Sequence, residues 1–291
     1  MINRKKLIWT LCTVIGVLLV GAVVLGILNA LVAEGKWSFG WRDYRYDESG
    51  YTVGEGSIPS DSITSIDVDW IDGSVVVASC QDRYPSVSEI AEGELPESAQ
   101  VRWRVDENGR LSIKYRKSSW FFAVGSGNRE KQLILRIPEA MMEKLTLLEL
   151  SGVSTNYTLN RVRADALSFS SVSGWLLTFE ASFDTVSASS ESGELSIGAD
   201  VKGAVSLSST YGNLTLTSAV TPDTLSLATK HGDVRLTLPA DASFCFDWSG
   251  KGSVTSDLPT THAGSRYCIG EGSRSYAITS KKGDLYLSCP H

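Results

Sequence analysis

Histidines are the first residues to consider for catalysis or metal binding, and the chain has three of them, His231, His262 and His291. Each is isolated from the other two and from any spacing typical of metal ligands. The G-x-S-x-G motif is absent, and SGKGSV from Ser249 lacks the first glycine and the Lys-Ser/Thr order of a phosphate-binding loop. The sequence therefore predicts no catalytic, cofactor-binding or metal-binding residue.

Polar side chains recur at one fixed place, where Glu194, Asn213 and Asp233 each follow a glycine. Stacked strands would place them about 4.8 Å apart. Such a ladder could bind calcium, or hold two carboxylates about 10 Å apart, near the separation found in inverting glycosidases. The alternative is that polar residues beside glycine satisfy the turn backbone and face water, and the sequence favours this alternative.

Those glycines belong to a repeat with the order glycine, polar, apolar, polar, apolar. The residues two and four positions after Gly193, Gly212 and Gly232 are all apolar, and so are those seven and five positions before. Alternation with a period of two places the apolar side chains on one face of a strand and Ser and Thr on the other. Glycine permits a backbone conformation that is costly for other residues. Each repeat is therefore predicted to be two short strands joined by a glycine turn.

The repeat extends toward the N-terminus. Gly174 marks one more unit, in which Thr178 breaks the apolar rule. Thr155 occupies the glycine position of the unit before, where Asn156 is expected to supply the unusual backbone angles. Successive anchors are 19 residues apart, and only the last interval is 20.

A fixed period near 20 with two strands per period is typical of a β-solenoid, whose units need stacked neighbours to bury their apolar faces. Two isolated units centred on Gly73 and Gly283 obey the same rule. The alternative is an antiparallel sandwich, but Asn-Gly and Asp-Gly hairpin signals are absent from the regular repeats. The predicted fold is all-β, a β-solenoid of coils about 20 residues long, with Leu195, Leu214 and Val234 in one internal ladder.

The N-terminal segment differs from the repeats because residues 7–33 carry no charged side chain. These 27 residues exceed the roughly 20 that a helix needs to cross a bilayer. Arg4, Lys5 and Lys6 precede the segment and Glu34 follows it. The positive-inside rule therefore predicts a cytoplasmic tail at residues 1–6, a transmembrane helix in the lipid bilayer at 7–33 and an extracytoplasmic remainder.

A cleaved signal peptide and a lipoprotein are the alternatives to this anchor. Signal peptides also begin with basic residues, but their apolar region is about 7 to 15 residues long, and NALVAEG is a poor cleavage site. Cys12 follows Leu11 rather than a small residue and lies inside the apolar run. The sequence therefore favours an uncleaved anchor with a cysteine buried in the membrane.

The exported part is acidic. The first 33 residues hold three basic and no acidic side chains, which leaves 24 Lys and Arg against 33 Asp and Glu, a net charge of −9. Nucleic-acid binding is disfavoured because phosphate affinity depends on clustered positive charge.

Four cysteines belong to this part, namely Cys80, Cys245, Cys268 and Cys289. Disulfides persist outside the cytoplasm, and four cysteines allow three pairings. A disulfide between Cys245 and Cys268 is preferred, because two-strand repeats bring sequence neighbours together. Four free thiols are the alternative.

Residues 34–60 combine aromatic rings with glycines and charges and show no sustained apolar period. They are predicted to be a juxtamembrane linker, with rings either at the membrane surface or packed on the domain. The domain is expected to span residues 61–291, and residues 81–100 are predicted to be an acidic insertion within it.

Three large apolar residues, Trp120, Phe121 and Phe122, lie together in an expected loop. An exposed apolar cluster of this kind can mark an interaction surface for a membrane or a partner. The alternative is that the rings cover the open end of the solenoid core, because a solenoid needs its terminal coils covered.

The order of the strand segments resembles that of a known family. SIDVDWIDGSVVV, GRLSIKY, KQLILRIPEAM, repeats such as LSLATKHGDVRLTLP, and YAITSKKGDLYLS follow one another across residues 61–291. This order resembles the bacterial family of membrane-anchored β-strand-repeat proteins that are named as candidate adhesins and catalogued as domain of unknown function 4097. The resemblance implies an extracytoplasmic β-solenoid and a bacterial source, and it implies no established activity because a fold alone does not determine a function.

These features predict a single-pass cell-membrane protein that displays a non-catalytic β-solenoid as an adhesion or cell-envelope interaction module. Its expected partner is a cell-wall polymer or an envelope protein. The alternative is an accessory or sensor protein of a cell-envelope stress system, although a tail of six residues is too short to hold an output domain. A carbohydrate-active β-solenoid enzyme is the third hypothesis.

Overall fold

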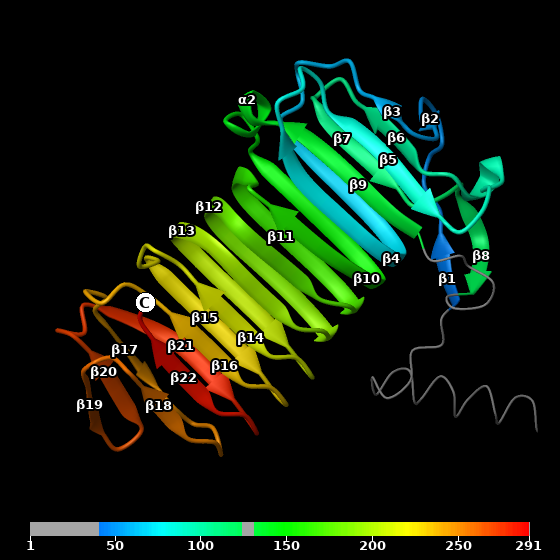
Figure 1. Ribbon diagram of the computed structural model, residues 1–291. Coiled ribbons are helices and arrows are strands. Elements are labelled where there is room, and N and C mark those ends of the chain that lie inside the picture. Colours follow the sequence, from blue (N-terminus) through cyan, green and yellow to red (C-terminus); the bar gives the residue numbers. More distant parts are fainter. Residues whose placement is uncertain (1–40, 124–130, 291) are drawn as a thin grey trace, which may run out of the picture. The chain divides into compact units, whose positions relative to one another are not determined.

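The computed structural model describes residues 41–123 and 131–290, which are mostly strands (Figure 1). The predicted transmembrane helix at residues 7–33 lies outside these ranges and stays a prediction. Within the described ranges, no helix is both long and apolar enough to cross a membrane. Strands β1 (Trp41–Tyr44) and β8 (Ser119–Ala123) form an antiparallel pair in a compact unit of their own.

The second unit contains all the other described elements. They are β2 (Thr52–Val53), β3 (Gly56–Ser57), β4 (Ser65–Cys80), β5 (Ser86–Ala91), the 3-10 helix η1 (Glu97–Ala99), β6 (Arg102–Val105), β7 (Arg110–Lys114), β9 (Lys131–Pro138), α2 (Glu139–Met142), β10 (Leu147–Asn160), β11 (Arg163–Ser173), β12 (Leu176–Ser192), β13 (Leu195–Ser209), β14 (Leu214–Thr217), β15 (Thr224–Thr229), β16 (Val234–Thr237), β17 (Phe244–Asp247), β18 (Val254–Ser256), β19 (Thr260–Ala263), β20 (Arg266–Ile269), β21 (Arg274–Ser280) and β22 (Leu285–Ser288).

The long strands of this unit pass through two sheets in succession. The first half of β4 pairs with β7 and with the first half of β10, and its second half pairs with β9 and the second half of β10. We call these the first and the second sheet. Strands β11 to β16 extend both sheets with parallel pairs, and β21 and β22 follow them in the stack (Figure 1). Two parallel sheets built one coil at a time confirm the predicted all-β, solenoid-like fold.

The strand register confirms the predicted internal ladder. Leu195 pairs with Leu214, which pairs in turn with Val234, and all three side chains are completely buried between the two sheets. Thr215, the next residue along β14, is partly exposed on the outer side. The core is therefore a set of apolar ladders that run along the stack.

The turn glycines allow successive coils to touch. A Cβ atom on Gly193 would lie 1.7 Å from the carbonyl oxygen of Gly174, and one on Gly212 would lie 1.8 Å from that of Gly193. Gly174 has a left-handed backbone with a φ of 116°, whereas Gly193 and Gly212 do not have a positive φ. Backbone angle was therefore the wrong reason for these two glycines, which are needed because the neighbouring backbone approaches too closely for a side chain.

Thr155 takes the place of the turn glycine in an earlier coil. Neither Thr155 nor Asn156 has a positive φ, so the expectation that Asn156 supplies unusual backbone angles is wrong. The Thr155 hydroxyl donates instead to the carbonyl oxygen of Trp70 in the neighbouring coil (2.9 Å). The Asn156 side-chain oxygen accepts the backbone N–H of Trp175 in the next coil (3.2 Å).

Hydroxyl groups three residues before the turn glycines connect the coils further. Each donates to the glycine carbonyl of the preceding coil: Ser209 to Gly193 (3.2 Å), Thr229 to Gly212 (3.0 Å) and Ser280 to Gly232 (2.8 Å). A hydrogen bond of this kind contributes about 1 kcal/mol. The Ser/Thr-x-x-Gly spacing is regular in the sequence, although the prediction of coils did not use it.

Both ends of the stack are closed by strands that the chain places out of sequence order. Strands β7 and β9 lie beyond β4, and antiparallel β6 and β5 cover them. Strands β17 and β18 lie beyond β21 and β22, and antiparallel β20 and β19 follow β17. Such covering strands protect open sheet edges from pairing with other chains.

Two segments differ from expectation at the first cover, namely the expected linker and the acidic insertion. Strands β2 and β3, within the segment expected to be a linker, pair with β6 and β5, so the unit begins at Tyr46 rather than near residue 61. The acidic segment at 81–100 contains β5, which pairs with β9 along its whole length. Both segments contain short strands whose pairing partners are distant in the sequence. The local sequence pattern therefore did not reveal these strands.

A buried ion pair lies beneath the first cover. The Lys131 ammonium is 2.5 Å from a carboxylate oxygen of Glu89, and it donates to the carbonyl oxygens of Ala99 (2.6 Å) and Tyr115. Its nitrogen also lies 4.0 Å from the centre of the Tyr115 ring. Burial lowers the pKa of Lys131 to about 8, and the Glu89 carboxylate opposes part of this shift.

Candidate functional site

The regular stack is interrupted by a β-bulge between β12 and β13. Pairing stops after Thr178 and Ile197 and resumes at Ala181 and Ala199, so two residues of β12 face one residue of β13. The facing residue is Gly198, where a Cβ atom would lie 2.7 Å from the carbonyl oxygen of Thr178. Bulges of this kind redirect side chains and are frequent beside functional sites.

Two residues at this edge have backbone angles that are uncommon for a residue other than glycine. Glu180 in the bulge has a φ of 49°, and Arg161 in the preceding coil has a φ of 55°. The Arg161 guanidinium binds the Glu180 carboxylate at 2.8 Å. The backbone N–H of Arg161 donates to the carbonyl oxygen of Phe179 (3.0 Å). The ion pair is about two-thirds exposed, so it orders this edge more than it stabilises the fold.

The bulge borders two adjoining hollows, which we call the bulge groove. The larger has a volume of about 670 Å³, and the smaller, of about 430 Å³, shares Arg163 and Glu180 with it. The larger hollow is lined by Arg163, Thr178, Phe179, Glu180, Ala181, Ser182, Gly198, Ala199, Asp200, Thr217 and Ala219. The smaller is lined by Glu139, Met142, Glu143, Arg161, Arg163 and Glu180.

The bulge groove combines an aromatic ring with polar groups over a surface of small residues. Phe179 is 48% exposed at its side, although it is a large apolar residue. The Thr178 hydroxyl is buried and has no hydrogen-bond partner among the described residues. Asp200 accepts the backbone N–H of Ala219 (3.0 Å), which holds its carboxylate at the edge of the groove. An aromatic surface with a few placed polar groups suits the binding of a ligand that is partly apolar and partly hydroxylated.

The ladder after the turn glycines has a structural role. The Asn213 side-chain oxygen accepts the backbone N–H of Asp233 (2.9 Å), and an Asp233 carboxylate oxygen accepts that of Asp284 (3.0 Å). Asp284 repeats the pattern with the backbone N–H of Ser253 (2.7 Å), a bond that lowers its pKa. The Asn213 and Asp233 side chains therefore join one turn to the next, as the turn alternative expects of these two residues.

Each of the two described histidines stacks on a tyrosine. The His231 ring lies 4.9 Å from that of Tyr211, and the His262 ring lies 5.5 Å from that of Tyr267. His291 lies outside the described residues. Among the residues that the structure describes, no group of three or more His, Cys, Asp or Glu side chains could hold a metal ion.

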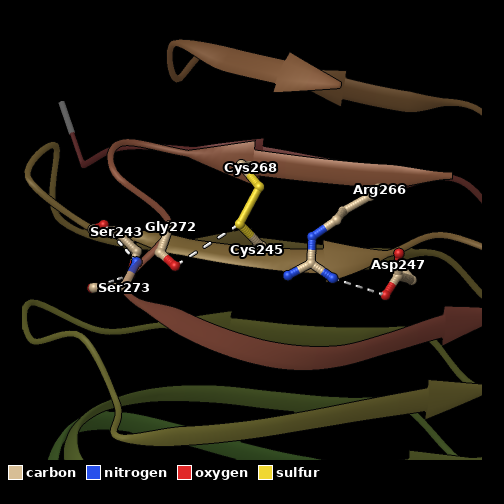
Figure 2. The surroundings of a disulfide bond; sticks show 7 residues. All are labelled: Ser243, Cys245, Asp247, Arg266, Cys268, Gly272 and Ser273. Atoms are coloured by element: carbon tan, nitrogen blue, oxygen red, sulfur yellow. Dashed lines mark hydrogen bonds and ion pairs between the residues drawn. A yellow bond between two sulfur atoms is a disulfide. The ribbon is translucent and has the colours of Figure 1, made fainter. Parts of the chain in front are cut away.

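Cys245 and Cys268 form a disulfide, which is the pairing that the sequence favours (Figure 2). They face each other directly across the antiparallel pair of β17 and β20. Arg266 and Asp247 form an exposed ion pair on the same two strands (3.5 Å). Cys80 and Cys289 are free thiols, and burial raises the pKa of Cys80. The disulfide lies in the cover beyond β21, so it belongs to the closed end of the stack.

The expected aromatic surface has a different local structure. Trp120, Phe121 and Phe122 lie in strand β8 and not in a loop, because β8 pairs with β1 and Phe122 lies opposite Arg42. The side chains of these three residues lie outside what the structure describes. Their role as an interaction surface therefore stays a prediction.

The sequence did not identify the bulge groove. The one feature of the sequence that pointed to the groove was Thr178, a polar residue at a position that is otherwise apolar in every regular repeat. The backbone angles of Arg161 and Glu180 depend on contacts between coils, and periodicity does not report such contacts.

The family model described as Toastrack DUF4097 matches residues 63–288. No curated protein matches the chain. A solved structure of a candidate cell adhesion protein from Clostridium sporogenes aligns with 82% of this chain and 100% of its own, with 11% identity and a TM-score of 0.43. That of a candidate adhesin from Bacteroides fragilis aligns with 82% of this chain and 97% of its own, with 11% identity and a TM-score of 0.46.

Proposed function

Because the chain belongs to the Toastrack DUF4097 family, we propose that it is a non-catalytic, membrane-anchored module for adhesion or cell-envelope interaction. Residues 7–33 anchor it in the bilayer, and the β-solenoid binds a cell-wall glycan on the outer side of the membrane. The observation that carries this proposal is the bulge groove, where the exposed Phe179 ring adjoins the polar groups of Arg163 and Asp200.

A glycan fits the groove by its chemistry. One face of a sugar ring is a set of C–H groups that packs on an aromatic ring, while its hydroxyls need donors and acceptors at the edge. Phe179 supplies the ring, Arg163 the donors, and the Asp200 carboxylate the acceptors. The groove is open and crosses several coils, which suits a chain-like ligand more than a small molecule.

The proposed lack of catalysis follows from how the carboxylates are used. Glu180 is paired with Arg161, Asp200 holds a backbone N–H, and Asp233 links two turns. Acid and base catalysis needs groups that converge on one reacting bond with matched proton affinities. Here these three carboxylates support backbone and side-chain geometry instead.

The test is binding of the full chain, purified in a non-ionic detergent, to insoluble cell-wall polysaccharide from which phosphate-bearing polymers have been removed. Phe179→Ala and Arg163→Gln should each weaken binding about tenfold, which corresponds to about 1.4 kcal/mol. Tyr286→Ala, which removes an exposed ring of the second sheet outside the groove, is the control and should leave binding unchanged. If Phe179→Ala and Arg163→Gln bound the polysaccharide as tightly as the control Tyr286→Ala, the groove would not be the binding site.

A further inference from the structure

A second surface lies at the other end of the second-sheet strands, where the chain turns into them from the first sheet. Lys230 and His231 precede the turn at Gly232, Lys281 and Lys282 precede the turn at Gly283, and Lys251 precedes the turn at Gly252. These turns are consecutive in the stack, because a Cβ on Gly283 would contact the Gly232 carbonyl and one on Gly252 would contact that of Gly283. We call this set of turns the basic edge.

The basic edge cannot be recognised in the sequence, because its lysines come from separate segments. Lys230 and Lys251 are 21 residues apart, and Lys251 and Lys281 are 30 residues apart, so no basic run is visible. The fold brings them together because β21 and β22 insert between the coil of β15 and β16 and that of β17 and β18. The sequence disfavours nucleic-acid binding because it shows no clustered positive charge, whereas the fold gathers these lysines on one edge of an otherwise acidic domain.

The charges of the basic edge are available to a ligand. All four lysine side chains are exposed, and within the described ranges none of them forms an ion pair. The three turns hold two carboxylates, and both are engaged there, since Asp233 accepts the Asp284 backbone N–H and Asp284 accepts that of Ser253. Glu191 and Glu194 lie two coils further along the stack, at the turn of Gly193. Four ammonium groups against two carboxylates leave a local excess of positive charge.

A hollow of about 470 Å³ opens between these turns and contains no carboxylate. Eight of its eleven lining residues carry a hydroxyl, two are Lys230 and Lys281, and one is alanine. Ser190 at its inner side is buried, and its hydroxyl has no hydrogen-bond partner among the described residues. Hydroxyls and ammonium groups without a competing carboxylate form an environment for an oxyanion.

We propose that the basic edge binds the phosphate groups of a phosphodiester-linked polymer. One phosphate enters the hollow, where Lys230 and Lys281 neutralise it. The hydroxyls of Ser208, Thr210, Ser249 and Thr279 donate to its oxygens, since those of Ser209, Thr229 and Ser280 already donate to glycine carbonyls. Lys282 and Lys251 continue the positive charge on adjacent turns, and the exposed Tyr211 ring, stacked on His231, borders the same edge. Charge that repeats along the stack favours a polymer over a single ion, because weak contacts add along its length.

This second site extends the proposed envelope interaction to a different ligand chemistry, and it is tested with a probe that contains no sugar. Linear inorganic polyphosphate is titrated into the full chain in non-ionic detergent. Lys230→Gln/Lys281→Gln should weaken binding at least about tenfold and reduce the slope of log affinity against log salt by about 2. The control pair Lys117→Gln/Lys202→Gln removes two exposed lysines elsewhere and should change affinity less than twofold.

A carboxylate placed in the hollow gives an independent readout. Ser208→Asp should abolish polyphosphate binding, because Ser208 lines the hollow. Ser170→Asp, in the same outward row of the first sheet two coils away, should not. Both serines are exposed, so both variants should fold.

Three outcomes would overturn the proposal. They are failure of the wild-type chain to bind polyphosphate, equal losses in a variant and its matched control, and binding to mixed micelles of phosphatidylglycerol in place of polyphosphate. The last result would assign the edge to the membrane surface. Loss of polyphosphate binding with glycan binding intact, or the reverse, separates this proposal from that of the bulge groove.

Discussion

At the scale of single residues, the fold depends on how closely neighbouring turns approach. The turn glycines pack against the carbonyl oxygens of the preceding turns, and the hydroxyls three residues earlier donate to those same carbonyls. Asn213, Asp233 and Asp284 connect the turns on their outer side. Each coil is therefore joined to the next by a small set of side chains as well as by strand pairing.

The first prediction concerns Gly212. Its replacement by Ala should destabilise the domain by about 3 kcal/mol or more, since the new Cβ would lie 1.8 Å from the carbonyl oxygen of Gly193 and the backbone has to move. Tyr211→Ala, at the exposed neighbouring residue, should change stability by less than about 0.5 kcal/mol. Urea unfolding of both variants measures the difference. Similar stability of the two would mean that the turns do not approach as closely as described.

The second prediction concerns the buried Lys131 and its partner Glu89. The pKa of Lys131 is lowered by burial from 10.5 to about 8, so between these pH values the unfolded chain binds more protons than the folded chain. This group's contribution to the free energy of unfolding therefore rises with pH across that interval, and below it the contribution is constant. Wild type should gain stability relative to Lys131→Met/Glu89→Gln as pH increases from 8 toward 10.5.

Denaturant unfolding of both proteins over that range measures the effect. The double variant removes both members of the pair, so that no unpaired charge is left in the core. A stability difference that stays constant with pH would show that Lys131 keeps its ordinary pKa.

At the scale of elements, periodicity was enough to predict the coils. Alternation around glycine placed Leu195, Leu214 and Val234 in one ladder, and the strand register places them there. Two features escaped this reasoning for the same physical reason. The bulge at Glu180 and the covering strands β2, β3 and β5 depend on contacts with residues distant in the sequence, and a local pattern carries no information about such contacts.

The third prediction tests the inward and outward assignment on β14. Leu214→Asp should unfold the domain, because an unpaired charge in a core costs several kcal/mol and the total stability of a domain is about 5 to 15 kcal/mol. Thr215→Asp, one residue along and on the outer side, should be tolerated. Circular dichroism and thermal unfolding of the two variants decide between them. Equal effects would mean that the assignment of the two faces is wrong.

At the scale of the whole molecule, the solenoid presents different chemistry on different surfaces. The bulge groove combines a ring with polar groups, and the basic edge concentrates lysines that are distant in the sequence. Of these, the sequence predicted neither, although it predicted a binding module with a repeating surface. A repeat can be recognised in a sequence. The two candidate binding surfaces cannot, because each is built from side chains of several coils that come together only when the coils stack.

The fourth prediction concerns topology, which rests on the basic residues at 4–6 and the uncharged segment that follows. A reporter enzyme that functions only outside the cytoplasm, fused after His291, should be active. A reporter that functions only in the cytoplasm should be inactive at the same position. The opposite pair of results would place the domain inside the cell and contradict the proposed anchor.

The central claim is that the domain binds a cell-wall glycan and does not cleave it, and one experiment measures both parts on the same samples. The full chain is incubated with phosphate-free cell-wall polysaccharide, and the fraction of protein that sediments and the reducing ends released are determined together. We expect sedimentation that depends on Phe179, with reducing ends at the level of the protein-free blank. Release of reducing ends that disappears in Glu194→Ala or Asp233→Ala would contradict it, because the ladder of turn residues would then be catalytic.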